Sequence, residues 1–179
     1  GAPKVDDYPG YLYVIVHVVA PAKDGKLETV ELDLVLGRSF VITHDPEGVV
    51  TEQLRAELRR QCRVLAKGPA WFAHEVLDRA VDLYLPVVDR IDGDIESLES
   101  EVLAAAGTRR GPTVLRRILR FKRVLQDLRR TSVHQREILL RLARGEFDEI
   151  PADAVPFYRD VYDHFLRFSD LVESYRDLV

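Results

Sequence analysis

The sequence predicts an α+β fold in which a small antiparallel sheet packs with one helix and is followed by long antiparallel, coiled-coil-like helices and a C-terminal stalk helix. Three observations lead to this prediction. The first forty residues contain β-branched and aromatic runs separated by short turns, which is typical of strands. From about residue 70 onward, apolar residues recur at alternating steps of four and three, as in helices that pack side by side. Finally, two successive helical segments carry opposite charge.

Three strands are expected near the N-terminus, at residues 11–20, 30–36 and 39–43. The first is rich in valine and aromatic residues and too short for a typical helix. The second alternates apolar side chains with mostly acidic ones, as in a strand with one buried face. Because the connections are short, an antiparallel meander is expected. A helix over 49–66 completes an α/β subdomain that spans residues 1–66.

Two long helices are expected next, over residues 70–105 and 113–144. Pro86 lies within the first and is expected to kink it, because proline cannot donate a backbone hydrogen bond. A turn at 107–112, rich in glycine and proline, joins the two helices. A short turn brings neighbouring helices back antiparallel, so residues 67–145 are expected to form a helical hairpin.

The two helices of this hairpin differ in charge. Acidic side chains dominate residues 75–101, whereas arginines dominate residues 116–144. Antiparallel neighbours of opposite charge attract, although each exposed pair contributes only a few tenths to about 1 kcal/mol. The apolar seams are therefore expected to supply most of the stability, and the charges to select partner and orientation.

The last helix is expected to begin near Pro156 and to carry one apolar seam. The seam comprises Tyr158, Val161, Phe165, Phe168, Val172, Tyr175 and Val179. No glycine, proline or polar cap closes the pattern, although helices commonly end on such residues. We therefore expect residues 146–179 to form a loop and the start of a longer stalk helix.

Composition argues against several functions. A formal net charge of −4 does not favour nucleic-acid binding, and the lone Cys62 allows no internal disulfide. No apolar run approaches the roughly 18 residues needed to cross a bilayer. The sequence contains no nucleophile elbow, phosphate loop or dinucleotide fingerprint. We therefore expect neither an enzyme nor a protein with a small-molecule substrate.

Four segments together resemble one known protein family. They are residues 3–16, 34–43, 82–99 and 157–177, and the last, with Tyr158-Arg-Asp-Val-Tyr-Asp-His164, is the most specific. They are similar to the cytoplasmic domain of CorA-type magnesium transporters. The family's Gly-Met-Asn signature and its two membrane helices are absent from this sequence. The match begins partway through the family's sheet, so a partial sheet is expected.

The resemblance implies a cation-sensing, gating domain on the cytoplasmic face of the cell membrane. Its stalk helix would lead into the missing membrane helices, and the full-length protein would be a homopentamer. The transported ion would be Mg²⁺, with Co²⁺ or Ni²⁺ left open. No nucleic-acid partner is implied.

The resemblance also points to Asp160 and Asp78 as ligands of a regulatory Mg²⁺ held between neighbouring subunits. Mg²⁺ favours one or two carboxylates and retains several waters. The family places a partner acid upstream of the segments present, so weak Mg²⁺ binding is expected from this chain alone. Four further metal candidates are Asp163, His164, Asp89 and Asp92.

Alternative interpretations stay open at this point. The acids could form a solvated helical face, and His164 could simply be satisfied by a neighbouring carboxylate. Within transporters, a ZntB-like zinc transporter domain fits the same segments. A helical protein-interaction scaffold with no ion role would instead bind a partner along the seam of residues 156–179.

Overall fold

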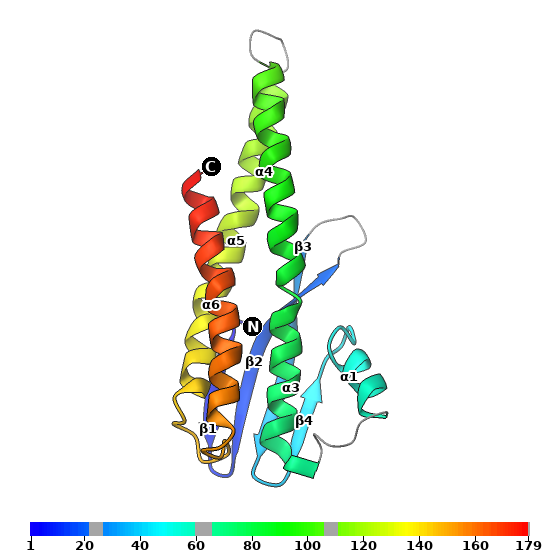
Figure 1. Cartoon of the computed structure of the whole chain (residues 1–179), viewed down its shortest axis with the longest axis vertical. Coiled ribbons are helices and arrows are strands. Elements are labelled where there is room, and N and C mark those ends of the chain that lie inside the picture. Colours follow the sequence, from blue (N-terminus) through cyan, green and yellow to red (C-terminus); the bar gives the residue numbers. More distant parts are fainter. Residues whose placement is uncertain (22–26, 60–65, 106–110, 179) are drawn as a thin grey trace.

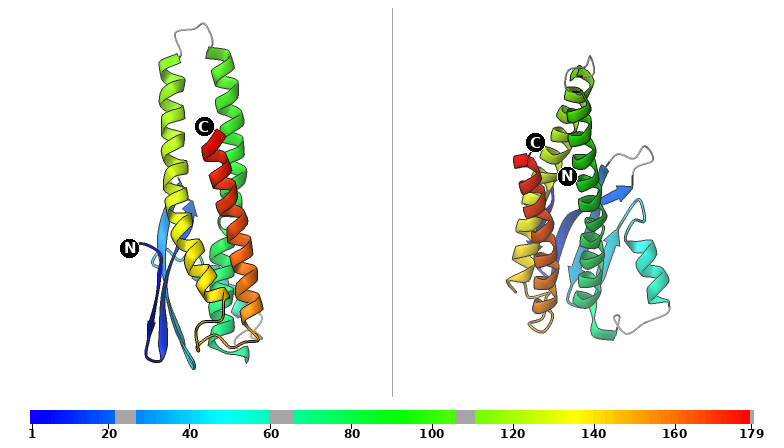
Figure 2. Two further views of the ribbon diagram at one scale, coloured as in Figure 1. Left: turned by 90° about the vertical axis from the view of Figure 1, so that its left-hand side faces the viewer. Right: turned by 45° about the horizontal axis from the view of Figure 1, so that its top comes forward.

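The computed structural model describes residues 1–21, 27–59, 66–105 and 111–178. A small sheet forms one layer, and long helices cover one of its faces (Figures 1 and 2). This arrangement confirms the predicted α+β class. Among the described residues, no helix combines the length and the apolarity needed to span a membrane.

The sheet consists of β1 (Lys4–Tyr8), β2 (Tyr11–Pro21), β3 (Leu27–Gly37) and β4 (Val41–His44), in that spatial order. Every neighbouring pair is antiparallel. Val14 of β2 lies opposite both Val5 of β1 and Leu34 of β3, and all three side chains are buried. The predicted meander is therefore confirmed.

The prediction of three strands was wrong, because β1 adds a fourth at the edge of the sheet. Its sequence carries Asp6 and Asp7, and Val5 is its only buried residue. An edge strand has only one neighbour and can be largely polar, so it lacks the alternation that marks the other strands. The strand β1 is recognised only by its backbone pairing with β2.

Helix α1 (Thr51–Leu58) is short and lies beside β4. The predicted helix over 49–66 includes residues 60–65, which lie outside the described residues. The Asp45 carboxylate fixes the start of α1 by accepting hydrogen bonds from the backbone N–H groups of Val49, Val50 and Thr51. Burial raises the pKa of Asp45, but these hydrogen bonds outweigh it and leave the pKa below its usual value.

The predicted helix over 70–105 is two helices, α3 (Pro69–Asp82) and α4 (Leu85–Ala105). A turn at Leu83 and Tyr84 separates them, so the expected kink is a break. Pro86 lies in the first turn of α4, where its missing N–H costs little, but it could not continue the hydrogen bonding of α3.

Helix α5 (Gly111–Ala143) returns antiparallel to α4, and α6 (Val155–Leu178) then packs against α5 and α3 (Figure 1). The predicted antiparallel return is confirmed for α4 and α5, whereas α3, which the prediction placed in the same hairpin, packs against α6 and the sheet instead. All described members of the predicted α6 seam are buried, from Tyr158 to Tyr175. Val179 lies outside the described residues. The seam is filled within the chain, which contradicts a scaffold that binds its partner there.

A polar group inside the helical layer has a structural reason. Pairing of β1 with β2 ends at Ile15, so the backbone of His17 needs other partners. Gln135 of α5 accepts a hydrogen bond from the His17 N–H at 2.7 Å, and the Tyr84 hydroxyl donates to the His17 carbonyl at 2.8 Å. Helix α5 and the α3–α4 break thus supply the hydrogen-bond partners that β1 does not provide at this end of β2.

The opposite charges of the helices are used only in part within the hairpin. Arg117 of α5 pairs with Glu101 of α4 and lies 4.0 Å from Asp94. Other arginines of α5 face α6 instead, as in the pairs Arg129–Glu173 at 3.6 Å and Arg136–Asp170 at 4.0 Å. The arginines of α5 therefore form ion pairs with acidic residues of both α4 and α6.

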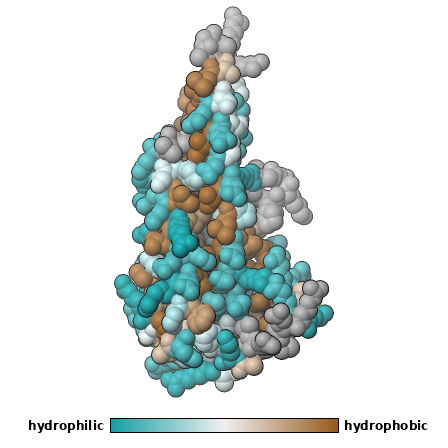
Figure 3. Space-filling model, viewed as in Figure 1, coloured by the Kyte–Doolittle hydropathy of each residue, from teal (hydrophilic) through white to brown (hydrophobic). Residues whose placement is uncertain are grey.

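The hairpin tip, residues 99–105 and 111–119, extends past the end of α6 (Figures 1 and 2). Its exposed apolar side chains are Val102, Leu103, Leu115 and Leu119. Figure 3 shows hydrophobic residues reaching the surface in a band along the long axis of the molecule. The tip is a two-helix structure with part of its apolar seam open.

Candidate metal site between two helices

The first turns of α3 and α6 are joined by aromatic residues. The Tyr158 hydroxyl donates to the Ala70 carbonyl at 2.6 Å, and the Trp71 and Phe157 rings meet edge to face with centroids 4.7 Å apart. Further along, Tyr84 contacts Phe165. Residue numbers rise together along the contact, so α3 and α6 run parallel, which sets the opposing residues at each level.

Between these two levels the contact carries three possible metal ligands. Asp78 and Asp82 lie one helical turn apart on α3, and His164 lies opposite them on α6. One ligand atom from each side chain can be chosen such that all three lie within 4.8 Å of one another. Asp78 is half-buried, whereas Asp82 and His164 are exposed, so solvent reaches the group.

The electrostatics of this cluster favour a cation. Burial and the nearby Asp78 charge raise the pKa of Asp82, while His164 and Arg79 act in the opposite direction. Arg79 is already engaged, because its guanidinium pairs with Glu57 of α1. Two carboxylates held one turn apart repel each other, and a divalent cation between them would remove that repulsion.

The donor set is two carboxylates and one imidazole. Hydrated Mg²⁺ can be held by one or two carboxylates, with waters completing its octahedron, so the two aspartates fit it. Imidazole nitrogen is instead a preferred ligand of Zn²⁺, Ni²⁺ and related transition metals. The same group could therefore hold Mg²⁺ through its acids alone, or a transition metal with His164 added.

The structure brings together two of the six residues singled out from the sequence, Asp78 and His164. Asp160 lies one turn before His164 on α6 and is exposed, as is Asp163. Neither belongs to the three-residue group. Both residues are therefore accessible to solvent in this chain.

The two candidates on α4 are also outside the group. Asp92 accepts a hydrogen bond from the Tyr175 hydroxyl, which ties the upper part of α6 to α4. Burial, followed by the Asp92 carboxylate, raises the pKa of Tyr175 to about 12. Asp89 is exposed and adds to this negative field. Asp92 therefore has a structural role in this chain.

Asp82 was not among the predicted site residues. Its only signal in the sequence is its spacing of four from Asp78, which places both carboxylates on one helical face. That spacing is common on acidic helices. The neighbouring His164 is 82 residues away in sequence, and only the packing of α6 on α3 brings it close.

Comparison with known proteins identifies the family of this chain. The family model described as "CorA-like Mg2+ transporter protein" matches residues 2–179. The chain belongs to this family. The resemblance found in the sequence is thereby confirmed, and the family is one of transporters.

A curated relative is the "Cobalt/magnesium transport protein CorA" of Thermotoga maritima, 31% identical over 180 residues. The match covers 99% of this chain and 50% of that protein. The chain thus spans about half the length of the curated relatives it matches.

Two solved structures share the CorA fold. The soluble domain of CorA from Methanocaldococcus jannaschii superposes with a TM-score of 0.80 at 18% identity, covering 98% of this chain and 69% of that one. The ZntB cytoplasmic domain from Vibrio parahaemolyticus gives a TM-score of 0.75 at 13% identity, covering 99% and 68%. Both likenesses are of fold.

Proposed function

We propose that this CorA-family chain is the regulatory, cation-sensing and gating domain of a divalent-cation transporter. The observation that carries the proposal is the group of Asp78, Asp82 and His164 on facing helices. A cation held there touches both α3, which packs on the sheet, and α6, the helix with the uniform apolar seam. Binding would therefore favour one position of α6 over others.

The mechanism is a shift between two arrangements of α6. Without a cation, Asp78 and Asp82 repel each other, and the His164 imidazole has no metal ion to bind. With a cation, the ligands of both helices are joined and α6 is held against α3. If α6 continues as a stalk into membrane helices, this small local change reaches the pore as a movement of one rigid rod.

Assembly would add a second set of contacts. The exposed Asp160 would bind a regulatory Mg²⁺ together with an acid from a neighbouring copy, in a homopentamer at the cytoplasmic face of the cell membrane. Its carboxylate points to solvent in the single chain, which is compatible with such a role. Because that site needs two chains, we expect only weak Mg²⁺ binding there by this chain alone.

A zinc-type function is the second candidate, and His164 is the observation that favours it. An imidazole beside two carboxylates is a better ligand set for Zn²⁺, Co²⁺ or Ni²⁺ than for Mg²⁺. The relative affinities of this site for these ions therefore distinguish a magnesium sensor from a ZntB-like sensor.

The experiment is titration calorimetry of this chain with Mg²⁺, Co²⁺ and Zn²⁺, followed by limited proteolysis at the same ion concentrations. Four proteins are compared: wild type, Asp78→Asn/Asp82→Asn, His164→Gln and Asp160→Asn. The matched control is Glu96→Gln/Glu99→Gln, which removes two exposed acids from α4. It measures general attraction of cations to an acidic helix.

The aspartate double variant should lose at least about tenfold in affinity for every ion, as loss of even an indirect ligand does. His164→Gln should weaken Co²⁺ and Zn²⁺ binding and leave Mg²⁺ unchanged. Asp160→Asn should reduce Mg²⁺ binding only slightly in the isolated chain, because the site of Asp160 is incomplete there. Equal losses in the Glu96 and Glu99 control, or protease resistance that does not respond to any ion, would contradict the proposal.

A further inference from the structure

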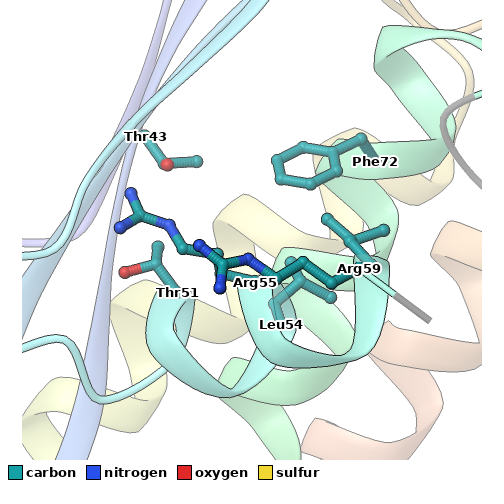
Figure 4. A pocket seen from close by; sticks show the side chains of 7 residues that line it. Thr43, Thr51, Leu54, Arg55, Arg59 and Phe72 are labelled. Atoms are coloured by element: carbon teal, nitrogen blue, oxygen red, sulfur yellow. The ribbon is translucent and has the colours of Figure 1, made fainter. Parts of the chain in front are cut away.

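A pocket of about 420 Å³ lies between β4, α1 and α3, away from the metal cluster. Its polar lining consists of Thr43 from β4, of Thr51 and Arg55 from α1, and of Arg59, the residue that caps the C-terminus of α1. In Figure 4 both arginine side chains extend towards the two threonines. The volume is in the range of small-molecule sites, roughly 300–1,000 Å³.

The charge of this pocket is not neutralised by the described part of the chain. Arg55 and Arg59 lie one helical turn apart, and neither side chain forms an ion pair or hydrogen bond with any described residue. Two nearby acids are engaged elsewhere, since Asp45 binds the start of α1 and Glu57 pairs with Arg79. Glu52, in the first turn of α1, is exposed and forms no ion pair with either arginine. Two guanidinium groups on one face repel each other, which an anion between them would relieve.

Hydrogen-bond donors other than the guanidinium groups are also present. The Thr51 hydroxyl already donates to Asp45 at 3.1 Å. The Thr43 hydroxyl has no hydrogen-bond partner among the described residues and lines the pocket on the β4 side. Two arginines and one hydroxyl can together donate to the oxygens of a phosphate, and the planar fork of arginine suits this geometry.

The remaining walls are apolar. Phe72 of α3 is half-buried and faces the arginine side chains from the α3 side of the pocket (Figure 4). Leu54 and Leu58 of α1 also line the pocket. An aromatic ring beside aliphatic side chains is a suitable surface for a flat heterocycle, because bases stack on such rings. Inorganic phosphate alone would leave this half of the pocket unused.

We infer that this pocket binds a phosphorylated small molecule with a planar ring, of which a nucleotide is the simplest example. The phosphates contact Arg55, Arg59 and Thr43, and the ring lies against Phe72. This site is independent of the proposed metal sensor, since it shares no residue with it. It does adjoin α3, so a ligand there would join α1, β4 and α3 into one unit.

The test is titration calorimetry of this chain with ATP, ADP, pyrophosphate and adenosine, in EDTA so that bound metal contributes nothing. ATP and ADP should bind saturably and more tightly than either pyrophosphate or adenosine, because only they use both halves of the pocket. Arg55→Gln/Arg59→Gln should weaken ATP about tenfold or more, which is the effect of losing charge-assisted hydrogen bonds. Phe72→Leu should weaken ATP and leave pyrophosphate unchanged.

The matched control is Arg116→Gln/Arg120→Gln, a second exposed arginine pair with the same spacing, on α5. It should bind ATP as the wild type does. Thermal unfolding of each variant without ligand shows whether it is folded, and Arg55→Lys/Arg59→Lys keeps the charge if the glutamine variant unfolds. Absence of saturable nucleotide binding to the wild type, or an equal loss in the control pair, would overturn the inference.

Discussion

The α3–α6 contact and the hairpin tip are built from the same kinds of residues, yet one is buried and the other is largely open. In the contact, Phe165 is 0% and Tyr84 1% exposed, whereas in the tip Leu103 is 79% and Leu115 56% exposed. At the contact a third helix and the sheet cover the apolar seam, whereas at the tip α5 is the only neighbour of α4 among the described residues (Figure 1). Seam spacing therefore predicts a helix, but stability depends on what covers the seam.

The largest effect is expected from shortening one apolar side chain in each region. Phe165→Ala should lower the free energy of unfolding by about 3–5 kcal/mol, because it leaves a cavity among fully buried residues. Leu103→Ala should change it by no more than about 0.5 kcal/mol, because the side chain is already in water. Urea denaturation of both variants measures the difference, and similar losses in the two would refute the distinction.

An intermediate effect is expected at Tyr175, where α6 meets α4. Tyr175→Phe removes a hydrogen bond to the Asp92 carboxylate and should cost about 1.5–3 kcal/mol at neutral pH. Because the folded-state pKa of Tyr175 is raised to about 12, its contribution is complete below the ordinary pKa of 10 and is lost as the pH rises from 10 to 12.

The pH dependence of the Tyr175→Phe effect provides its control. The difference in unfolding free energy between wild type and Tyr175→Phe should be constant from pH 7 to 9 and shrink above pH 10. A difference that grows with pH would mean that the hydroxyl is not held by Asp92 in solution.

The smallest effect is expected from the ion pairs that join the two helices of the hairpin. Arg117→Gln removes contacts with Glu101 and Asp94, but all three side chains are partly exposed. We expect a loss below about 1 kcal/mol, and less in high salt. Denaturation at two ionic strengths measures it; a large, salt-independent loss would show that charge holds the hairpin together.

Much of this fold follows from patterns within single segments. The α6 seam from Tyr158 to Tyr175 was predictable, because regular spacing of large apolar residues has one good solution in a helix. The edge strand β1 was not, since Asp6 and Asp7 carry no alternation and only pairing with β2 selects an extended backbone. Pro86 predicted a kink near the position of the break. That the helix is interrupted there, and not merely kinked, depends on the contacts of Tyr84 with β2.

The candidate metal site shows a different limit. Asp78 and His164 were each identified from a resemblance or from neighbouring acids, but nothing in the sequence placed them together. Their proximity depends on α3 and α6 running parallel at one particular level. Asp82 completes the group only at that level, so the site is a property of helix packing and not of any local motif.

The break between α3 and α4 also has a mechanical consequence. Tyr84 is fastened to the His17 carbonyl, and its ring touches Phe165 and Phe168 of α6, with centroids 5.1 and 4.7 Å away. Because α5 is continuous past this level and packs along α6, a sideways load on the far end of the α4–α5 hairpin would reach α6 by two routes, along α5 and through the Tyr84 ring. Both routes end on the helix that also carries His164.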